Sequence, residues 1–163
     1  MGISVICAYD AAEDRYRVFM GDNIRQFQDL ADRTDLLVGF NSAAFDDMLC
    51  SVNGIHVDTD YDIQREFYIA KGLEPYPERY DARYKGMSLD GICKANLKIS
   101  KTGNGAMAPV LWQKGKIGQV IDYCLMDVRL CVGLMQKITS GNQLICPVDG
   151  KKYRLREPLC EWE

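Results

Sequence analysis

Apolar and polar positions alternate along this chain with two different periods, which predicts a mixture of strands and helices. Residues 3 to 9 are apolar on both alternating faces, as in a strand that is covered on two sides. Arg15 to Met20 is its predicted hairpin partner, and residues 10 to 14 supply the turn. A helix is expected next, with Asp22 or Asn23 as its N-cap.

The order of strand and then helix recurs farther along the chain. Leu36 to Phe40 reads as a short buried strand, and Asn41-Ser42 opens a helix that runs through about Val52. Asn53-Gly54 ends this helix, and residues 55 to 70 predict another short strand that runs into a helix. The alternation favours a mixed α/β domain with helices on both faces of a sheet.

The second half of the chain is predicted to contain two helices and a terminal hairpin. Residues 74 to 85 have the composition of an exposed loop, and Ser88 caps a helix that extends to about Leu97. Residues 98 to 118 are rich in glycine and are expected to be mostly irregular. Val120 to Ile138 predicts the longest helix, and residues 143 to 156 predict a β-hairpin. The expected division is therefore a main domain, residues 1 to 138, and a C-terminal extension, residues 139 to 163.

Composition is that of a globular protein with a substantial core, since 47% of the 163 residues are hydrophobic and 26% are charged. A net charge of −3 argues against a surface that is basic all over, although a local basic stripe remains allowed. The seven cysteines show no C-x-x-C spacing, which favours reduced thiols and a cytoplasmic location. Neither a signal peptide nor a membrane span is expected, because the N-terminus lacks a basic region and a long apolar run.

Three side chains carry the candidate chemistry. Tyr123 and Asp127 are four positions apart in the predicted long helix, so they share one helix face. Asp46 follows a buried strand and falls in the first turn of a helix, at the edge of an α/β sheet where ligands gather. Each signal also has a structural interpretation: an ordinary neighbouring pair for Tyr123 and Asp127, and complementation of the helix dipole for Asp46.

Together these segments resemble the DEDD superfamily of 3′–5′ exonucleases, in its tyrosine variant, on a ribonuclease H-like fold. The resemblance covers roughly residues 3 to 138. It rests on the N-x-x-x-F-D element at Asn41 to Asp46, the S-L-D helix start at residues 88 to 90, and Y-x-x-x-D at Tyr123 to Asp127. The histidine variant would need histidine five positions before the last aspartate, where this chain has Asp122.

The resemblance implies a role for each matching residue. Asp46 and Asp127 would be metal ligands for Mg²⁺ or Mn²⁺, and Tyr123 would position the attacking water. Asn41 and Asp90 would be accessory residues. The implied activity is hydrolysis at the 3′ end of single-stranded DNA or RNA, in which two metal ions activate a water and stabilise the leaving oxygen.

One element of the family pattern is missing. Family members carry their first two acids as D-x-E on a strand that precedes the hairpin, and the substitute here, Asp10 with Glu13 or Asp14, has the wrong spacing for one strand face. The chain is therefore expected to be weakly active or inactive. The alternative is a catalytically dead protein that binds nucleic acid or associates with itself or another protein.

Loss of that strand would leave two sheet fragments with unpaired edges facing each other. Three arrangements are predicted to resolve this: direct pairing of the remaining strands, a strand donated by a second copy or a partner, or a longer natural protein.

A local concentration of positive charge is the remaining candidate for nucleic-acid contact. No acidic residue occurs between Gly91 and Ile121. This segment has two equal alternatives. It is either a track for phosphates in which Trp112 stacks on a base, or a flexible solvated loop with Trp112 in the core. The residues are Lys94, Lys98, Lys101, Trp112, Lys114 and Lys116. The acidic run Asp58 to Asp62 is interpreted as a solvated turn, because it lacks the glycine and glutamate of a calcium-binding EF-hand.

Overall fold

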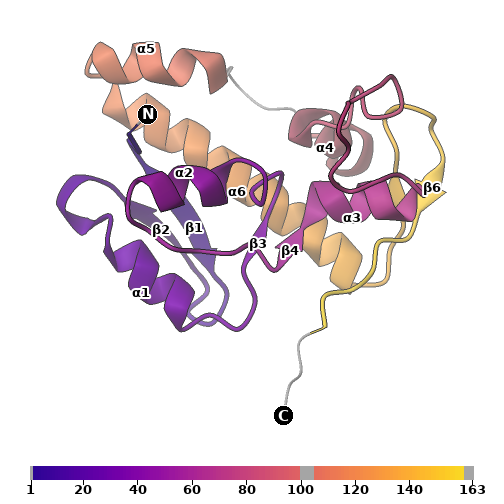
Figure 1. Ribbon diagram of the computed structural model, residues 1–163, viewed down its shortest axis with the longest axis horizontal. Helices are drawn as coiled ribbons and strands as arrows, with labels where there is room; N and C mark the ends of the chain where they lie inside the picture. The colour runs from indigo at the N-terminus through magenta and orange to yellow at the C-terminus, as the bar shows by residue number, and fades with distance from the viewer. Residues whose placement is uncertain (1, 100–104, 160–163) are drawn as a thin grey trace.

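The computed structural model describes residues 2–99 and 105–159, and these residues form a mixed α/β structure, as the sequence predicts (Figure 1). None of the helices in these ranges is both long enough and apolar enough to cross a membrane. The helices are α1 (Gln26–Asp32), α2 (Asp46–Val52), α3 (Ile63–Ala70), α4 (Leu89–Leu97), α5 (Ala108–Gln113) and α6 (Ile117–Thr139), with the 3-10 turns η1 (Gly21–Asn23) and η2 (Gly105–Met107). The strands are β1 (Ile6–Asp10), β2 (Arg15–Phe19), β3 (Val38–Gly39), β4 (Tyr61–Asp62), β5 (Leu144–Ile145) and β6 (Lys152–Tyr153).

Within the described residues the strands form three separate two-stranded ladders. β1 and β2 are antiparallel, β3 and β4 are parallel, and β5 and β6 form the predicted C-terminal hairpin. In the described part of the chain β1 and β3 are not hydrogen-bonded neighbours. Direct pairing of the two sheet fragments, one of the three predicted arrangements, therefore does not occur here. The expected single sheet with helices on both faces is also absent from these residues.

Helix boundaries follow the caps that the sequence provides. Ser88 Oγ accepts a hydrogen bond from the Gly91 N–H at 3.1 Å and begins α4 where predicted. α1 begins later than predicted, because Asn23 Oδ1 accepts from the Met20 N–H at 2.7 Å and holds the 3-10 turn η1. α2 begins at Asp46 rather than near Asn41, because Asn41 adopts a left-handed conformation with φ of +57°.

The prediction for residues 98 to 118 was wrong in part, since the six-residue helix α5 lies within them. Pro109 lies in the first turn of α5, where backbone N–H groups have no partner inside the helix. The N–H that proline lacks therefore costs no hydrogen bond. Flanking glycines at positions 105 and 115 gave the segment its irregular character in the sequence.

In residues 2–99 and 105–159, two hydrophobic clusters stabilise the fold. One lies under the β1–β2 hairpin and α1 and includes Phe19, Phe27 and Leu30. The larger one joins α3, α4 and α6, and it also contains Leu144 and Cys146 from the C-terminal hairpin. α6 packs against both β1 and α4, and it crosses the molecule behind the other elements in Figure 1. The C-terminal extension thus shares its core with the first 138 residues.

Gly91→Ala is expected to destabilise the protein by about 1–3 kcal/mol, although alanine favours a helix. An added Cβ at Gly91 would lie 2.6 Å from the carbonyl oxygen of Gly86, a backbone atom that cannot rotate away. Gly118→Ala in α6 is the matched control, since its Cβ would meet nothing within 4 Å. Urea unfolding midpoints should therefore move in opposite directions for the two variants, and a stabilised Gly91→Ala protein would contradict this packing.

Candidate carboxylate site

The loop before Asp46 is held in place by Asp62. Asp62 caps α3 by accepting from the N–H groups of Gln64 and Arg65. Its two oxygens also accept from the Asn41 N–H at 2.9 Å and the Ala43 N–H at 3.2 Å. One buried carboxylate therefore joins the start of α3 to the loop that leads into α2. The sequence predicted only a turn at this position and missed its role.

Asp46 lies in the first turn of α2, within reach of three other acids. Burial of its carboxyl group raises the pKa of Asp46, although the residue as a whole is exposed. A hydrogen bond from Ser42 lowers this pKa, and the charges of Asp47, Asp62 and Asp127 raise it further. Asp46 on α2 and Asp127 on α6 are therefore close enough for one charge to act on the other. The fold places these two predicted residues within electrostatic reach of each other.

Tyr123 and Asp127 both lie on α6, as predicted, and one carboxylate oxygen of Asp127 is buried from solvent. The Tyr123 hydroxyl lies against η2, where a Cβ built on Gly105 would be 2.9 Å from the hydroxyl oxygen. Glycine at position 105 thus leaves space for the phenol. Whether the phenol positions a water molecule stays a prediction.

The side chains of the two accessory residues make other contacts. Asn41 Oδ1 accepts a hydrogen bond from Arg65 Nη2 at 2.8 Å, so its side chain helps to hold a buried arginine. Asp90 pairs with Lys94 at 2.7 Å along α4. Within the described residues, Asp90 is not among the charges that act on Asp46.

The other acids of interest are engaged by neighbouring groups. Asp10 accepts a hydrogen bond from Arg17 Nε at 3.0 Å, and Glu13 pairs with the same arginine at 2.8 Å. Asp60 accepts from the Leu37 N–H at 2.7 Å. The solvated turn predicted for residues 58 to 62 was therefore wrong in part: Asp58 and Asp60 are exposed, but Tyr61 and Asp62 are buried in β4. The contacts with Arg17 give Asp10 and Glu13 an ordinary role in the hairpin.

The predicted basic residues are spread over two helices that pack on different parts of α6 (Figure 1). Lys94 and Lys98 are exposed on and after α4. Lys114 and Lys116 are exposed between α5 and α6, and Trp112 is half-buried on α5. Lys101 lies outside the described residues.

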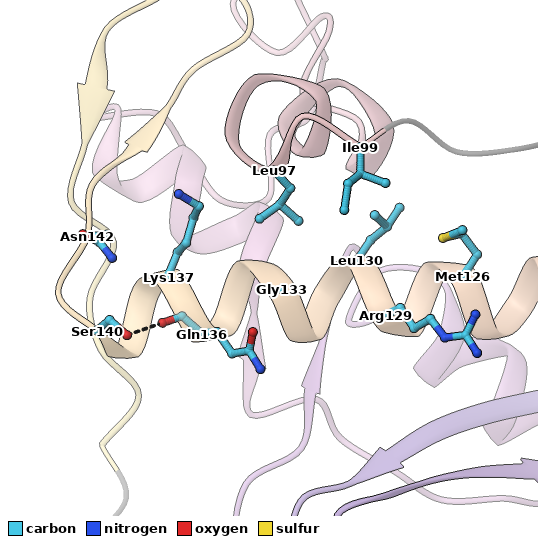
Figure 2. A pocket seen from close by; sticks show the side chains of 10 residues that line it. All are labelled: Leu97, Ile99, Met126, Arg129, Leu130, Gly133, Gln136, Lys137, Ser140 and Asn142. Carbon is cyan, nitrogen blue, oxygen red and sulfur yellow. Dashed lines mark hydrogen bonds between the residues drawn. The ribbon is translucent and has the colours of Figure 1, made fainter.

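A groove of about 580 Å³ lies between the end of α4 and α6. Figure 2 shows Leu97 and Ile99 pointing toward α6, where Met126 and Leu130 face them. α4 can pack closely against α6 because residue 133 is glycine. An added Cβ at this position would lie 2.9 Å from Leu97 Cδ1. The groove is therefore mainly apolar, and neither Asp46 nor Tyr123 lines it.

Two cationic residues of this groove were not predicted from the sequence. Arg129 and Lys137 contribute to its lining, and the Arg129 guanidinium also lies 5.5 Å from the centre of the Tyr16 ring. The basic residues predicted to contact nucleic acid lie in the segment without acids and end at Lys116, before α6 begins. A helical plot of α6 could have indicated them, since positions 126, 129, 130, 133 and 137 fall on one helix face.

The pH dependence of stability is expected to report on Asp46. Because folding raises its pKa, the native state keeps this proton at pH values where the unfolded chain has released it. The free energy of unfolding should thus fall as pH rises from the ordinary aspartate range, about pH 4, through the raised pKa. Asp46→Asn should flatten that part of a urea-unfolding profile, whereas Asp122→Asn, an exposed position on α6, should not. Superimposable profiles for Asp46→Asn and wild type would exclude the shift.

Residues 2–99 and 105–159 contain no group of three or more His, Cys, Asp or Glu side chains that could hold a metal ion. Of the predicted set, Asp46 and Asp127 are the two acids within electrostatic reach of each other in these ranges. No protein-family model matches the sequence, and comparison with curated proteins and with solved structures gives no match either.

Proposed function

We propose that this chain is a nucleic-acid-processing domain of the 3′–5′ exonuclease type, in which Asp46 and Asp127 supply part of a divalent-metal site. One observation carries the proposal. Asp46 and Asp127 come from distant segments, and the charge of Asp127 nevertheless raises the pKa of Asp46, after the larger effects of burial and of the charges of Asp47 and Asp62. These are the two acids that the motifs single out, and an arbitrary pair of surface acids would have no reason to meet.

The arrangement of strands is consistent with a ribonuclease H-like domain that lacks its central strand. β2 and β1 form one ladder, and β3 and β4 form another, with no hydrogen-bonded link between β1 and β3 in the described residues. A strand between them would join the two ladders into one sheet. We propose this fold on the order of its elements and on that break.

The acid pair fits a divalent cation in charge. The charges of Asp46 and Asp127 repel each other, and one oxygen of Asp127 is buried from solvent. A bound cation would therefore reduce the repulsion between the two carboxylates. Bound Mg²⁺ or Mn²⁺ would supply Lewis-acid activation of water and stabilisation of the leaving 3′ oxygen. Tyr123 would orient the water from the same helix. Two carboxylates are fewer than such a site ordinarily uses, so we expect weak activity from this chain alone.

The proposal is tested by metal binding and by end degradation together. Isothermal titration with Mn²⁺ should give saturable binding that weakens as pH falls and Asp46 takes up its proton. Single-stranded DNA and RNA labelled at the 5′ end should then be shortened stepwise from the 3′ end when Mn²⁺ is present. Absence of both binding and shortening would refute the proposal.

A non-catalytic protein on the same fold is the second candidate. It is favoured by the lack of a third metal ligand near the pair in the described ranges. This protein would bind single-stranded nucleic acid, or a second copy of itself, without any effect of Mn²⁺. A nucleic-acid affinity that is unchanged by Mn²⁺ and by chelator, with no shortening, would identify this candidate.

A further inference from the structure

The end of α4 and one face of α6 enclose the apolar groove described above. α4 ends at Lys98, which has a left-handed conformation with φ of +55°, and Ile99 after it points toward α6 (Figure 2). Leu130 lies at the bottom of the groove with 1% of its surface exposed, whereas 48% of the Ile99 surface is exposed. The groove therefore leaves apolar surface in contact with water, which an apolar ligand would cover.

The size and lining of the groove fit an elongated aliphatic molecule. Its volume of about 580 Å³ lies in the range of small-molecule sites, roughly 300–1,000 Å³. Between Met126 and Lys137 the groove follows α6 over a length of about 16 Å. The described residues that line it include no aromatic ring, so its walls offer aliphatic and thioether contacts rather than ring stacking.

The charge of the groove is positive. Figure 2 shows Lys137 on the same side of α6 as Leu97, at the opposite end of the groove from Met126. Lys137 is half-buried, and its ammonium group forms no ion pair with the described residues. None of the described residues that line the groove is acidic, in a chain that carries 23 acids. A positive charge beside an apolar wall, without a counter-charge, favours an anionic ligand.

The second cation of the groove, Arg129, already has a partner. Its side chain is exposed, and its guanidinium lies over the Tyr16 ring. Lys137 is therefore the cation that faces a ligand, and one ammonium group balances one negative charge. A carboxylate carries that charge, whereas a phosphate monoester carries roughly 1.5 to 2 negative charges at neutral pH.

We propose that this groove binds the anion of a medium-chain fatty acid. The carboxylate accepts hydrogen bonds from the Lys137 ammonium group, and the aliphatic chain lies along Leu97, Ile99 and Met126. Lys137 also complements the dipole of α6 from its last turn, a role that needs no groove. The inference goes beyond the proposed nuclease activity, because the acids and the tyrosine assigned to that activity do not line the groove.

The position of the ligand is tested by nuclear magnetic resonance of protein labelled in its methionine methyl groups. Decanoate, added below the concentration at which it forms micelles, should shift the Met126 signal in a saturable manner. Met48 on α2 is the internal control, since 66% of its surface is exposed outside the groove, and its signal should stay in place. A Met126 signal that does not respond to decanoate would overturn the proposal.

The role of Lys137 is tested with probes that share one aliphatic chain. Decanoate should bind more tightly than decanol, and decyltrimethylammonium should bind most weakly. Lys137→Met removes the charge and keeps most of the stem, so it should weaken decanoate binding about tenfold and leave decanol binding unchanged. Lys116→Met, at an exposed position before α6, is the matched control and should bind decanoate as the wild type does. Equal binding of the three probes would contradict an anion site.

The apolar wall is tested with Ile99→Ser. Because Ile99 is about half exposed, the variant should remain folded, which thermal unfolding checks. It should weaken decanoate and decanol alike, by about fivefold or more. Val148→Ser, at a position with 45% of its surface exposed outside the groove, should change neither. A protein with twice the mass of one chain that does not bind decanoate would assign the groove to a second copy and refute the proposal.

Discussion

Asp127→Asn is expected to weaken Mn²⁺ binding by roughly 100-fold or more and to remove any metal-dependent shortening of a nucleic-acid 3′ end. Asparagine has nearly the same shape, but it carries no charge. The substitution removes one of the two acids that the fold brings together, and it also removes the repulsion that raises the pKa of Asp46. The measurements are isothermal titration with Mn²⁺ and the stepwise degradation assay, each made on the wild type and the variant side by side.

Asp122→Asn is the matched control for this experiment. Asp122 lies on the same helix, five positions before Asp127, and its side chain is exposed. The same change of charge at this position should leave metal binding and degradation unaltered. Equal loss in the two variants would assign the effect to net charge, and full activity in Asp127→Asn would remove Asp127 from the site.

Leu134→Ala should cost about 2–5 kcal/mol of unfolding free energy, a large fraction of the roughly 5–15 kcal/mol that stabilises a typical domain. Leu134 on α6 is fully buried, with 0% of its surface exposed, in the cluster that joins α3, α4 and the C-terminal hairpin. Truncation leaves a cavity between elements that cannot all close on it. The expected fall in the thermal midpoint is roughly 5–15 °C for a chain of this length.

Val52→Ala on α2 is the control, because 71% of the Val52 surface is exposed. Its unfolding free energy should change by about 0.5 kcal/mol or less. If Leu134→Ala were as stable as this control, the C-terminal hairpin and α6 would not share one core. Circular dichroism during thermal and urea unfolding measures both variants.

Local signals in the sequence placed most of the helices and strands. The apolar spacing from Val120 to Ile138 predicted α6, which runs from Ile117 to Thr139, because a helix face repeats within two turns of the chain itself. Ser88 marked the start of α4 because its hydroxyl serves an N–H only three residues away. α5 was missed because glycines surround six residues whose helical state depends on packing against α6.

The candidate site was predicted less completely. The motifs singled out Asp46, Tyr123 and Asp127, and the fold brings Asp46 and Asp127 within electrostatic reach of each other. The same reasoning named Asp90, which pairs with Lys94 instead. It also gave Asp62 no structural role, because the N–H groups that this carboxylate binds lie about 20 residues earlier in the chain as well as in its own helix.

Periodicity, caps and turn residues were enough to establish a mixed α/β chain with a long late helix and a terminal hairpin, because each of these signals acts within a few residues. Contacts between distant segments set other features: the break between β1 and β3 in the described residues, and the placing of Asp46 within electrostatic reach of Asp127. These features depend on how whole elements pack. The free energy of that packing is shared among many side chains, so no single segment of the sequence determines it.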